Sequence, residues 1–158
     1  MAKMTIEVVF VPVTDVDRAK DFYVNKLGFH ADQDQKVKEG LRFVQLTPKG
    51  SGCSIAFGEG ITKMKPGTQQ GIMMVVENVR ALQKELHKKG VDITDIDKQP
   101  WGTFVYFKDP DGNGDGPYSS YHTNEISFPV LSSARHSFFC SNSPLAEIYG
   151  HPSAFGKP

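Results

Sequence analysis

The sequence predicts an α+β fold made of two tandem βαβββ units, followed by an atypical C-terminal tail. The first observation is an internal repeat, in which residues 8–29 align with residues 71–91. The second is that both segments indicate a strand and then a helix, while residues 41–52 and 103–114 both indicate a strand that ends in a turn. The third is that no helical or alternating period persists after residue 114. The internal repeat is the strongest of these observations, because a repeat constrains architecture more firmly than local propensity does.

Each helix is predicted from apolar side chains spaced three and four residues apart, with charged residues between them. Asp15 and Asn78 stand where an N-cap residue belongs, and Gly28 and Gly90 stand where a C-terminal glycine belongs. Both helices are therefore expected to begin and end at the same place in the unit. The apolar positions are Val16, Ala19, Phe22, Tyr23 and Leu27 in the first helix and Val79, Leu82, Leu86 and Val91 in the second.

The later strands of the two units end in matching turns at a constant offset of 62 residues, so that Pro48 meets Pro110. Aromatic and β-branched residues followed by Pro, Asp, Gly and Asn indicate a strand and a turn, so a hairpin partner should come next. In the first unit that partner is a good strand at residues 53–57. In the second unit the same register gives residues 115–119, which predict a poor strand because Gly and Pro weaken a strand interior.

The charge balance limits the classes of partner. Lys and Arg together number 18, as do Asp and Glu, so the formal net charge is zero. This removes the electrostatic case for nucleic acid or a membrane surface and leaves a small molecule or a like subunit. Cys53 and Cys140 lack CxxC spacing and are expected to be free thiols in a reducing compartment. The N-terminal run MAKMTIEVVFVPV contains Glu7 and Pro12 and indicates a strand instead of a signal peptide, so we expect a cytoplasmic protein.

Two motifs carry a resemblance to a known superfamily. The first comprises VTDVDRA, FY and LGF within residues 13–29, and the second is FKDPDGNG at residues 107–114. Together they resemble the vicinal oxygen chelate superfamily, which holds glyoxalases, bleomycin-resistance proteins, fosfomycin-resistance enzymes and extradiol dioxygenases. The resemblance covers about residues 5–114.

This resemblance implies a glyoxalase-like domain at residues 1–114, built of two repeats at about residues 5–60 and 69–119. The sheets of the two repeats are expected to curl into an open cup. The cup is usually completed within a pair of subunits in this superfamily, so a homodimer is also implied. Residues 115–158 form the atypical tail.

The resemblance also indicates where a metal would bind. Metal-using members line the cup with His, Gln or Glu at four strand positions, which fall here at Val8, Phe57, Gly71 and Ser119. Three of these residues have no side-chain lone pair to donate, and a lone serine is a feeble ligand. We therefore expect no metal and no other cofactor.

The tail after Gly114 has two alternative explanations. A loose or disordered extension would lose its pattern in this way. The second hypothesis is a reading-frame shift at Gly114, because permitted codons for residues 115–120 can be read in another frame as Trp-Thr-Leu-Gln-Gln, close to the W-x-L-Q-E that family members commonly carry there. Without a proper last strand, the strand at residues 103–107 has an open edge. We expect either residues 125–131 to supply a substitute strand or another subunit to cover this edge.

The predicted function is the binding of a small aromatic or amphipathic molecule in the cup without chemistry, as in bleomycin-resistance members. The alternatives are a divalent-metal-dependent lyase or dioxygenase with unrecognised ligands, and a degenerate dimerisation module that binds nothing. The sequence identifies no catalytic residue, so enzymatic activity stays open. Trp101, the only tryptophan, indicates either an aromatic wall for a planar ligand or packing against the sheet. The candidate lining residues are Phe10, Gln45, Ile55, Phe57, Met73, Trp101 and Tyr106.

Overall fold

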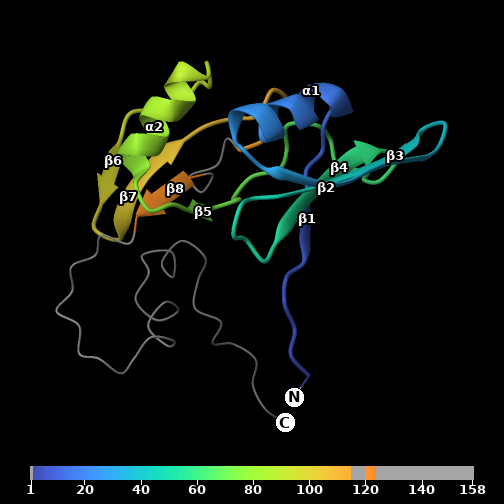
Figure 1. The fold of residues 1–158 in the computed structure, drawn as a ribbon, viewed down its shortest axis with the longest axis horizontal. Helices are drawn as coiled ribbons and strands as arrows, with labels where there is room; N and C mark the ends of the chain where they lie inside the picture. The colour runs from blue at the N-terminus through green and yellow to red at the C-terminus, as the bar shows by residue number, and fades with distance from the viewer. Residues whose placement is uncertain (1, 115–119, 124–158) are drawn as a thin grey trace, which may run out of the picture. The chain divides into compact units, whose positions relative to one another are not determined.

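The computed structural model describes residues 2–114 and 120–123, with the backbone alone in the second range. These residues belong to one compact unit, in which two βαβββ repeats follow each other along the chain (Figure 1). Each repeat combines one mixed four-stranded sheet with one helical segment. The predicted α+β class and the tandem arrangement are confirmed.

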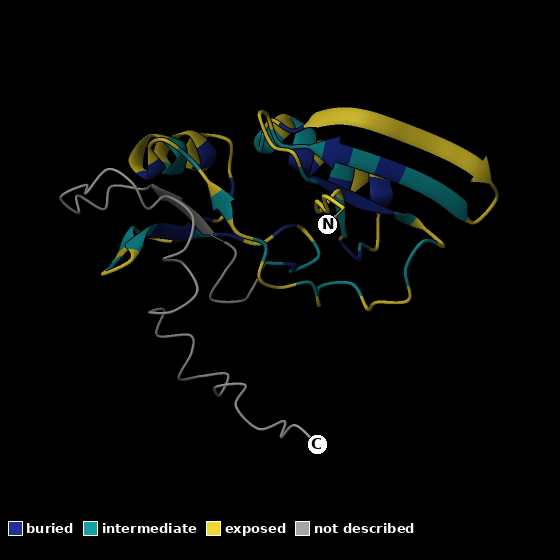
Figure 2. Cartoon of the chain, turned by 90° about the horizontal axis from the view of Figure 1, so that it is seen from below, coloured by how far each residue is buried: buried dark blue, intermediate teal, exposed yellow. Residues whose placement is uncertain are grey.

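The first repeat forms a sheet with the strand order β1-β4-β3-β2. β1 runs parallel to β4, and the other neighbouring strands are antiparallel. β2 is an edge strand that is exposed along its whole length (Figure 2), and its charged side chains disfavour pairing with other chains. The elements are β1 (Val8–Phe10), α1 (Val16–Asp21), the π-helical segment η1 (Phe22–Lys26), β2 (His30–Lys38), β3 (Leu41–Thr47) and β4 (Ser54–Glu59).

The second repeat repeats this topology, with the strand order β5-β8-β7-β6. β8 runs parallel to β5 and antiparallel to β7, so it covers the edge of β7. The alternative substitute strand at residues 125–131 lies outside the described residues, as does the poor strand at 115–119. The elements are β5 (Met74–Val75), α2 (Val79–Lys88), β6 (Asp97–Gln99), β7 (Gly102–Tyr106) and β8 (Ser120–Thr123).

The predicted helix boundaries are confirmed in both repeats. A carboxylate oxygen of Asp15 accepts a hydrogen bond from the third residue of its helix at 2.9 Å, and the side-chain oxygen of Asn78 does the same at 2.9 Å. Gly28 and Gly90 follow the helices with φ of 77° and 69°, which lie in the left-handed region that favours glycine.

The first helical segment differs from the second because it ends in π-helical geometry. The backbone N–H of Leu27 donates to the carbonyl of Phe22, five residues earlier, at 3.1 Å. The wider turn leaves the consecutive aromatic side chains of Phe22 and Tyr23 both buried, with each 6% exposed. Their rings meet edge to face with centroids 5.4 Å apart.

The core consists of the apolar helix faces and alternate strand positions. Val44 and Val105 are fully buried and are 61 positions apart, whereas the turn prolines are 62 apart. The second repeat therefore has one additional residue between its strand and its turn, and the constant offset of 62 does not hold within the strands. The buried cluster contains Val11, Val16, Ala19, Phe22, Tyr23, Phe29, Val44, Leu46, Ile55, Phe57, Val79, Leu86, Val91, Ile93, Val105 and Phe107.

The helices of the described ranges are short. None of them combines the length and the apolarity that crossing a lipid bilayer requires.

Candidate functional site

Strand register divides the first sheet into two faces. Residues directly opposite each other on paired strands share a face, and Val44 pairs with Phe57 while Gln45 pairs with Ala56. Val44 and Phe57 are buried in the core beneath α1. The other face points away from α1, and we call it the first outer face. It contains Val8, Phe10, His30, Gln33, Gln35, Phe43, Gln45, Thr47, Ser54, Ala56 and Gly58.

The polar residues of the first outer face form a ladder of hydrogen bonds. The amide nitrogen of Gln45 donates to the hydroxyl of Ser54 at 3.1 Å. The hydroxyls of Ser54 and Thr47 are 2.7 Å apart, and Thr47 donates in turn to the carboxylate of Asp32. This arrangement uses one N–H of Gln45 and leaves its other N–H and its carbonyl oxygen, and Gln45 shares the face with Phe10 and Phe43.

The second sheet divides in the same way. Val105 is fully buried in the core, while Phe104 pairs with Asp97 on the opposite face. We call this opposite face the second outer face. The rings of Phe104 and Tyr106 lie on it with centroids 6.4 Å apart and planes inclined by 14°. Its described members are Val75, Asp97, Gln99, Gly102, Phe104 and Tyr106.

A hydrogen-bonded group lies beside these two rings. The hydroxyl of Tyr106 donates to Asp97 Oδ2 at 3.1 Å, and Gln99 Nε2 lies 2.9 Å from both carboxylate oxygens of Asp97. Burial raises the pKa of the Tyr106 phenol above its ordinary value, and the neighbouring Asp97 raises it further. Tyr106 is therefore a neutral phenol at physiological pH.

The structure brings five of the seven sequence-predicted lining residues to exposed or half-exposed positions. Phe10, with 38% of its surface exposed, and Gln45 lie on the first outer face, and Tyr106 lies on the second. Met73 precedes β5 and Trp101 stands in the turn between β6 and β7, with exposed fractions of 44% and 49%.

The structure places the other two residues on the helix-covered face. Ile55 and Phe57 are 6% and 0% exposed and point into the core. The physical reason is strand alternation, since the β4 residues on the first outer face are Ser54, Ala56 and Gly58, each one residue away. Ile55 also lines a small recess of about 20 Å³ between the repeats, together with Tyr23 and Met74. This volume suits about one water molecule and is too small for a ligand.

Sequence reasoning missed Asp97, Gln99 and Phe104. The sequence did contain a signal for this group. Asp97 and Gln99 are two residues apart, as are Phe104 and Tyr106, and residues two apart in a strand point to the same face. A hairpin with its turn at Pro100 and Trp101 would have placed all four side chains on one face.

The two superfamily-like motifs meet in the structure, and their role is structural. Asp109 is buried, and its carboxylate accepts a hydrogen bond from the Tyr23 hydroxyl at 3.0 Å. The same carboxylate accepts the backbone N–H groups of Asp111 and Asn113, each at 2.9 Å, and the side-chain amide of Asn113 at 2.8 Å. That amide also donates to the carbonyl of Pro12 at 2.8 Å, which joins the turn of the second repeat to the first repeat.

A second set of contacts extends this junction. The guanidinium of Arg18 lies 2.7 Å from Asp111, and Thr14 also donates to the Asp111 carboxylate. We call Thr14, Arg18 and Tyr23, with Asp109, Asp111 and Asn113, the inter-repeat clasp. It fastens α1 to the turn after β7 and explains why the two motifs occur together.

The four positions that the resemblance assigns to metal ligands can now be placed in part. Val8 lies on the first outer face, Phe57 lies in the core, Gly71 precedes β5, and Ser119 lies outside the described residues. In the part of the chain that the structure describes, no three His, Cys, Asp or Glu side chains are grouped closely enough to hold a metal ion.

Comparisons with known proteins identify a family and a relative. The family model described as Glyoxalase/Bleomycin resistance protein/Dioxygenase superfamily matches residues 5–114. The chain is 28% identical over 110 residues to the protein YetH of Bacillus subtilis (strain 168), in an alignment that covers 68% of this chain and 92% of YetH.

Solved structures show the same fold. TnmS3, an antibiotic binding protein from Streptomyces sp. CB03234, is 33% identical, with a TM-score of 0.67 and coverage of 78% of this chain and 97% of TnmS3. A superfamily member from Sphaerobacter thermophilus DSM 20745 is 29% identical, with a TM-score of 0.64 and coverage of 77% and 96%. The chain belongs to the Glyoxalase/Bleomycin resistance protein/Dioxygenase superfamily.

Proposed function

We propose that this protein binds a small aromatic or amphipathic molecule against its outer faces and that binding requires no metal. The observation that carries the proposal is the chemistry of these faces. Phe10 and Phe43 lie on the first, and Tyr106 lies on the second, where its ring is nearly parallel to that of the buried Phe104. Rings beside a few oriented polar groups suit a planar ligand that is held by buried area and fixed by hydrogen bonds. The 33% identity to an antibiotic binding protein supports the same class of function.

The alternative of a divalent-metal-dependent lyase or dioxygenase makes a different prediction. Val8 and Gly71 supply no chelating side chain at the early family positions, and the β4 residues on the first outer face supply only Ser54 as a side-chain oxygen donor. Elemental analysis by mass spectrometry on protein purified without a metal-affinity tag separates the two functions. Stoichiometric iron, zinc, nickel or manganese would overturn the metal-independent proposal.

We further propose that a second copy of the chain completes the binding cup. Among the described strands, β1 and β5 each pair with one neighbour and end their sheets, so each has an edge that another chain can meet. Light scattering after size-exclusion chromatography tests this proposal. A mass near twice 17.5 kDa is expected, and a monomer across the concentration range would contradict it.

The binding proposal is tested with a panel of planar aromatic compounds. A compound that binds only the native state must raise the melting temperature, and Trp101 supplies a fluorescence signal because it is the only tryptophan. Phe10→Ala should weaken a binding compound about tenfold, by the loss of an aromatic contact. The matched control is Met64→Ala, where the side chain is 41% exposed and belongs to the segment between β4 and β5, outside both sheets. If no compound in the panel binds, the degenerate dimerisation module becomes the better function.

A further inference from the structure

We propose that Asp97, Gln99 and Tyr106 form an anchor on the second outer face that selects ligands carrying a protonated amine next to a planar ring. This inference rests on the proposed binding function and specifies the class of ligand. Nothing in the family motifs points to these residues, since all three lie outside residues 107–114 and 13–29. The following argument uses their hydrogen bonds, their charge and their aromatic neighbours.

The hydrogen bonds within the group make it an acceptor. The hydroxyl proton of Tyr106 is directed at Asp97 Oδ2, at 3.1 Å, and the Gln99 amide nitrogen is directed at both carboxylate oxygens, at 2.9 Å. Among the described residues, the lone pairs that remain for a ligand are those of the phenol oxygen, the Gln99 carbonyl and the outer side of the carboxylate. All of these accept hydrogen bonds, and they outnumber the one Gln99 N–H that the carboxylate does not use, so the group favours a ligand that donates hydrogen bonds.

The negative charge of the group comes from Asp97 alone. Asp97 is the one charged residue among the described positions of the second outer face, and Lys98 points to the opposite face by strand alternation. The formal net charge of the chain is zero, so the protein has no large overall field that would attract every cation. A cationic ligand therefore gains from Asp97 only when it reaches this face.

Aromatic rings adjoin the carboxylate. Phe104 stands directly opposite Asp97 on the neighbouring strand, and its ring lies 6.4 Å from that of Tyr106 with an angle of 14° between the planes. Phe104 is only 5% exposed, so the half-buried ring of Tyr106 is the one that a ligand can contact from solvent. Ring faces attract both planar ligands and cations, the latter through the ring quadrupole. A molecule with a planar ring and an amine can contact the Tyr106 ring and the carboxylate together, whereas a planar carboxylate would meet repulsion from Asp97.

The group is also accessible. Asp97, Gln99 and Tyr106 are each partly exposed on the open side of β6 and β7, which is the side away from the core residue Val105. Their internal hydrogen bonds hold the side chains in place before a ligand arrives, which lowers the conformational entropy lost on binding.

The test uses three probes that share one ring system: anthracene bearing an aminomethyl, a hydroxymethyl or a carboxylate group on the central ring. Affinities are measured by the fluorescence polarisation of the probe. The wild-type protein should bind the amine at least about tenfold more tightly than the neutral alcohol, and the carboxylate most weakly. Asp97→Asn keeps the size of the side chain and should reduce the amine-to-alcohol ratio to about one, while affinity for the alcohol changes little. Tyr106→Phe should reduce the ratio less.

The matched control is Asp95→Asn, which changes the net charge equally at an exposed position just before β6 and should keep the wild-type ratio. Circular dichroism and melting temperature establish that each variant is folded. Equal affinity for all three probes in the wild type would overturn the anchor while leaving the binding function standing. A preference for the amine that survives in Asp97→Asn would overturn the assignment to Asp97. No binding of any probe would overturn both the anchor and the proposed function.

Discussion

The two repeats share their backbone devices and differ in the side chains that act between elements. Asp15 and Asn78 cap their helices in the same way, and Gly28 and Gly90 follow the helices in the same left-handed conformation. The position of Tyr23 in the first helical segment corresponds to Leu86 in α2, 63 positions later, which is also buried but has no hydroxyl. The two repeats have thus kept the same backbone fold, while the side-chain contacts between their elements have diverged.

The inter-repeat clasp shows the consequence of this divergence. At the turn offset of 62, Asp109 and Asp111 correspond to Thr47 and Lys49. Neither Thr47 nor Lys49 can reproduce the buried carboxylate that accepts the Tyr23 hydroxyl and the turn amides. The clasp therefore forms from the first helix and the second turn only.

The outer faces show a second difference. Gln45 and Tyr106 are 61 positions apart, as are the core residues Val44 and Val105, so they occupy equivalent places in the two sheets. Gln45 belongs to a ladder of amide and hydroxyl groups, whereas Tyr106 belongs to a group centred on the carboxylate of Asp97. The two faces therefore differ in chemistry, since a carboxylate stands beside Tyr106 and an amide and two hydroxyls form the ladder at Gln45.

The largest expected effect comes from breaking the clasp. Asp109→Ala removes the acceptor of the Tyr23 hydroxyl and of two backbone N–H groups, and leaves these donors buried. We expect a loss of about 3 kcal/mol or more in the free energy of unfolding, measured by urea denaturation. Lys49→Ala, in the corresponding exposed turn of the first repeat, should change stability by less than about 0.5 kcal/mol. Similar losses in both variants would refute the asymmetry between the turns.

A smaller and symmetric effect is expected at the helix caps. Asp15→Ala and Asn78→Ala each remove one side-chain acceptor from the first turn of a helix. Each substitution should lower the free energy of unfolding by about 1 kcal/mol, because each cap accepts one hydrogen bond from a backbone N–H of its helix. Thermal unfolding monitored by circular dichroism measures both, with Asp15→Asn as the conservative control. A negligible cost at one cap would show that the repeats differ in their backbone devices as well.

The sequence allowed the tandem architecture and both sets of helix ends to be predicted, because caps and glycines act locally. The faces of the strands were harder to predict. One additional residue before the second turn shifts the strand against the turn, and a shift of one residue exchanges the two faces of a strand. In β4 of the first repeat the same alternation applies: Ile55 and Phe57 were expected on the outer face, whereas the neighbouring Ser54 and Ala56 lie there.

Other features depend on contacts that no local pattern encodes. The π-helical segment at Phe22 to Lys26 places two consecutive aromatic rings in the core, and the spacing of apolar residues predicted only a helix. The group around Asp97 arises from the pairing of β6 with β7, which positions Asp97 opposite Phe104. Its chemistry became visible only when the register was known.

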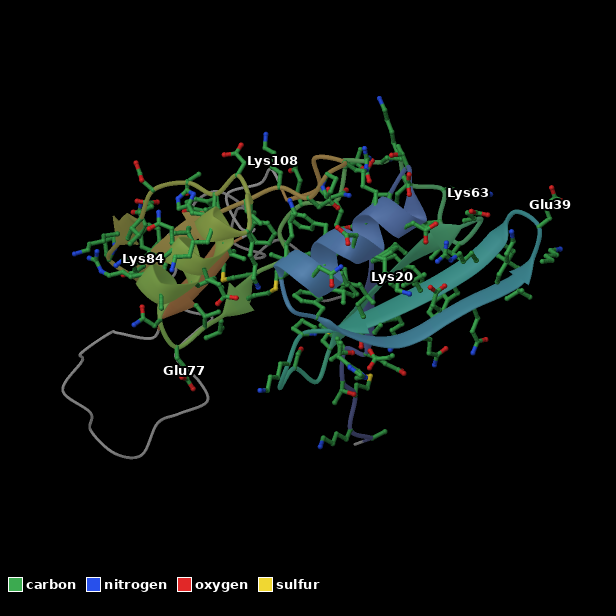
Figure 3. All side chains as sticks on the ribbon, turned by 45° about the horizontal axis from the view of Figure 1, so that its top comes forward. Lys20, Glu39, Lys63, Glu77, Lys84 and Lys108 are labelled. Atoms are coloured by element: carbon green, nitrogen blue, oxygen red, sulfur yellow. The ribbon has the colours of Figure 1, made fainter. Side chains whose placement is uncertain are left out.

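The ion pairs on the first sheet give a pH-dependent prediction. Arg42 contacts Asp34 at 2.8 Å, and Lys20 reaches from α1 toward β2 (Figure 3) to within 2.7 Å of the same carboxylate. Hydrogen bonds from Arg42, and then from Lys20, hold the pKa of Asp34 well below its ordinary value. This contribution to stability is present above the unfolded-state pKa of about 4 and is lost as pH falls through the folded-state pKa.

Arg42→Ala should therefore lower stability by about 1 kcal/mol at neutral pH, and the difference from wild type should narrow as the solution is acidified below about pH 4. Melting temperatures of both proteins across this pH range measure the effect. Arg80→Ala, at an exposed position of α2, removes the same charge from the second repeat and should have little effect at any of these pH values. A difference for Arg42→Ala that does not depend on pH would argue against the ionised Asp34 as its cause.

The smallest expected effect is the titration of a single phenol on the second outer face. Burial first, and Asp97 second, raise the pKa of Tyr106 above the ordinary value of about 10. Subtracting the ultraviolet tyrosinate titration of Tyr106→Phe from that of the wild type isolates this group among the five tyrosines. Its midpoint should lie above 10 in the wild type and should fall partway back in Asp97→Asn, because burial remains after the charge is removed. The neutral phenol stabilises the fold below the unfolded-state pKa, and this contribution disappears as pH rises through the folded-state pKa. An identical midpoint in the wild type and in Asp97→Asn would mean that the carboxylate does not act on Tyr106. The raised pKa of Tyr106 would then be due to burial alone, and the phenol and the carboxylate would not act as one electrostatic group.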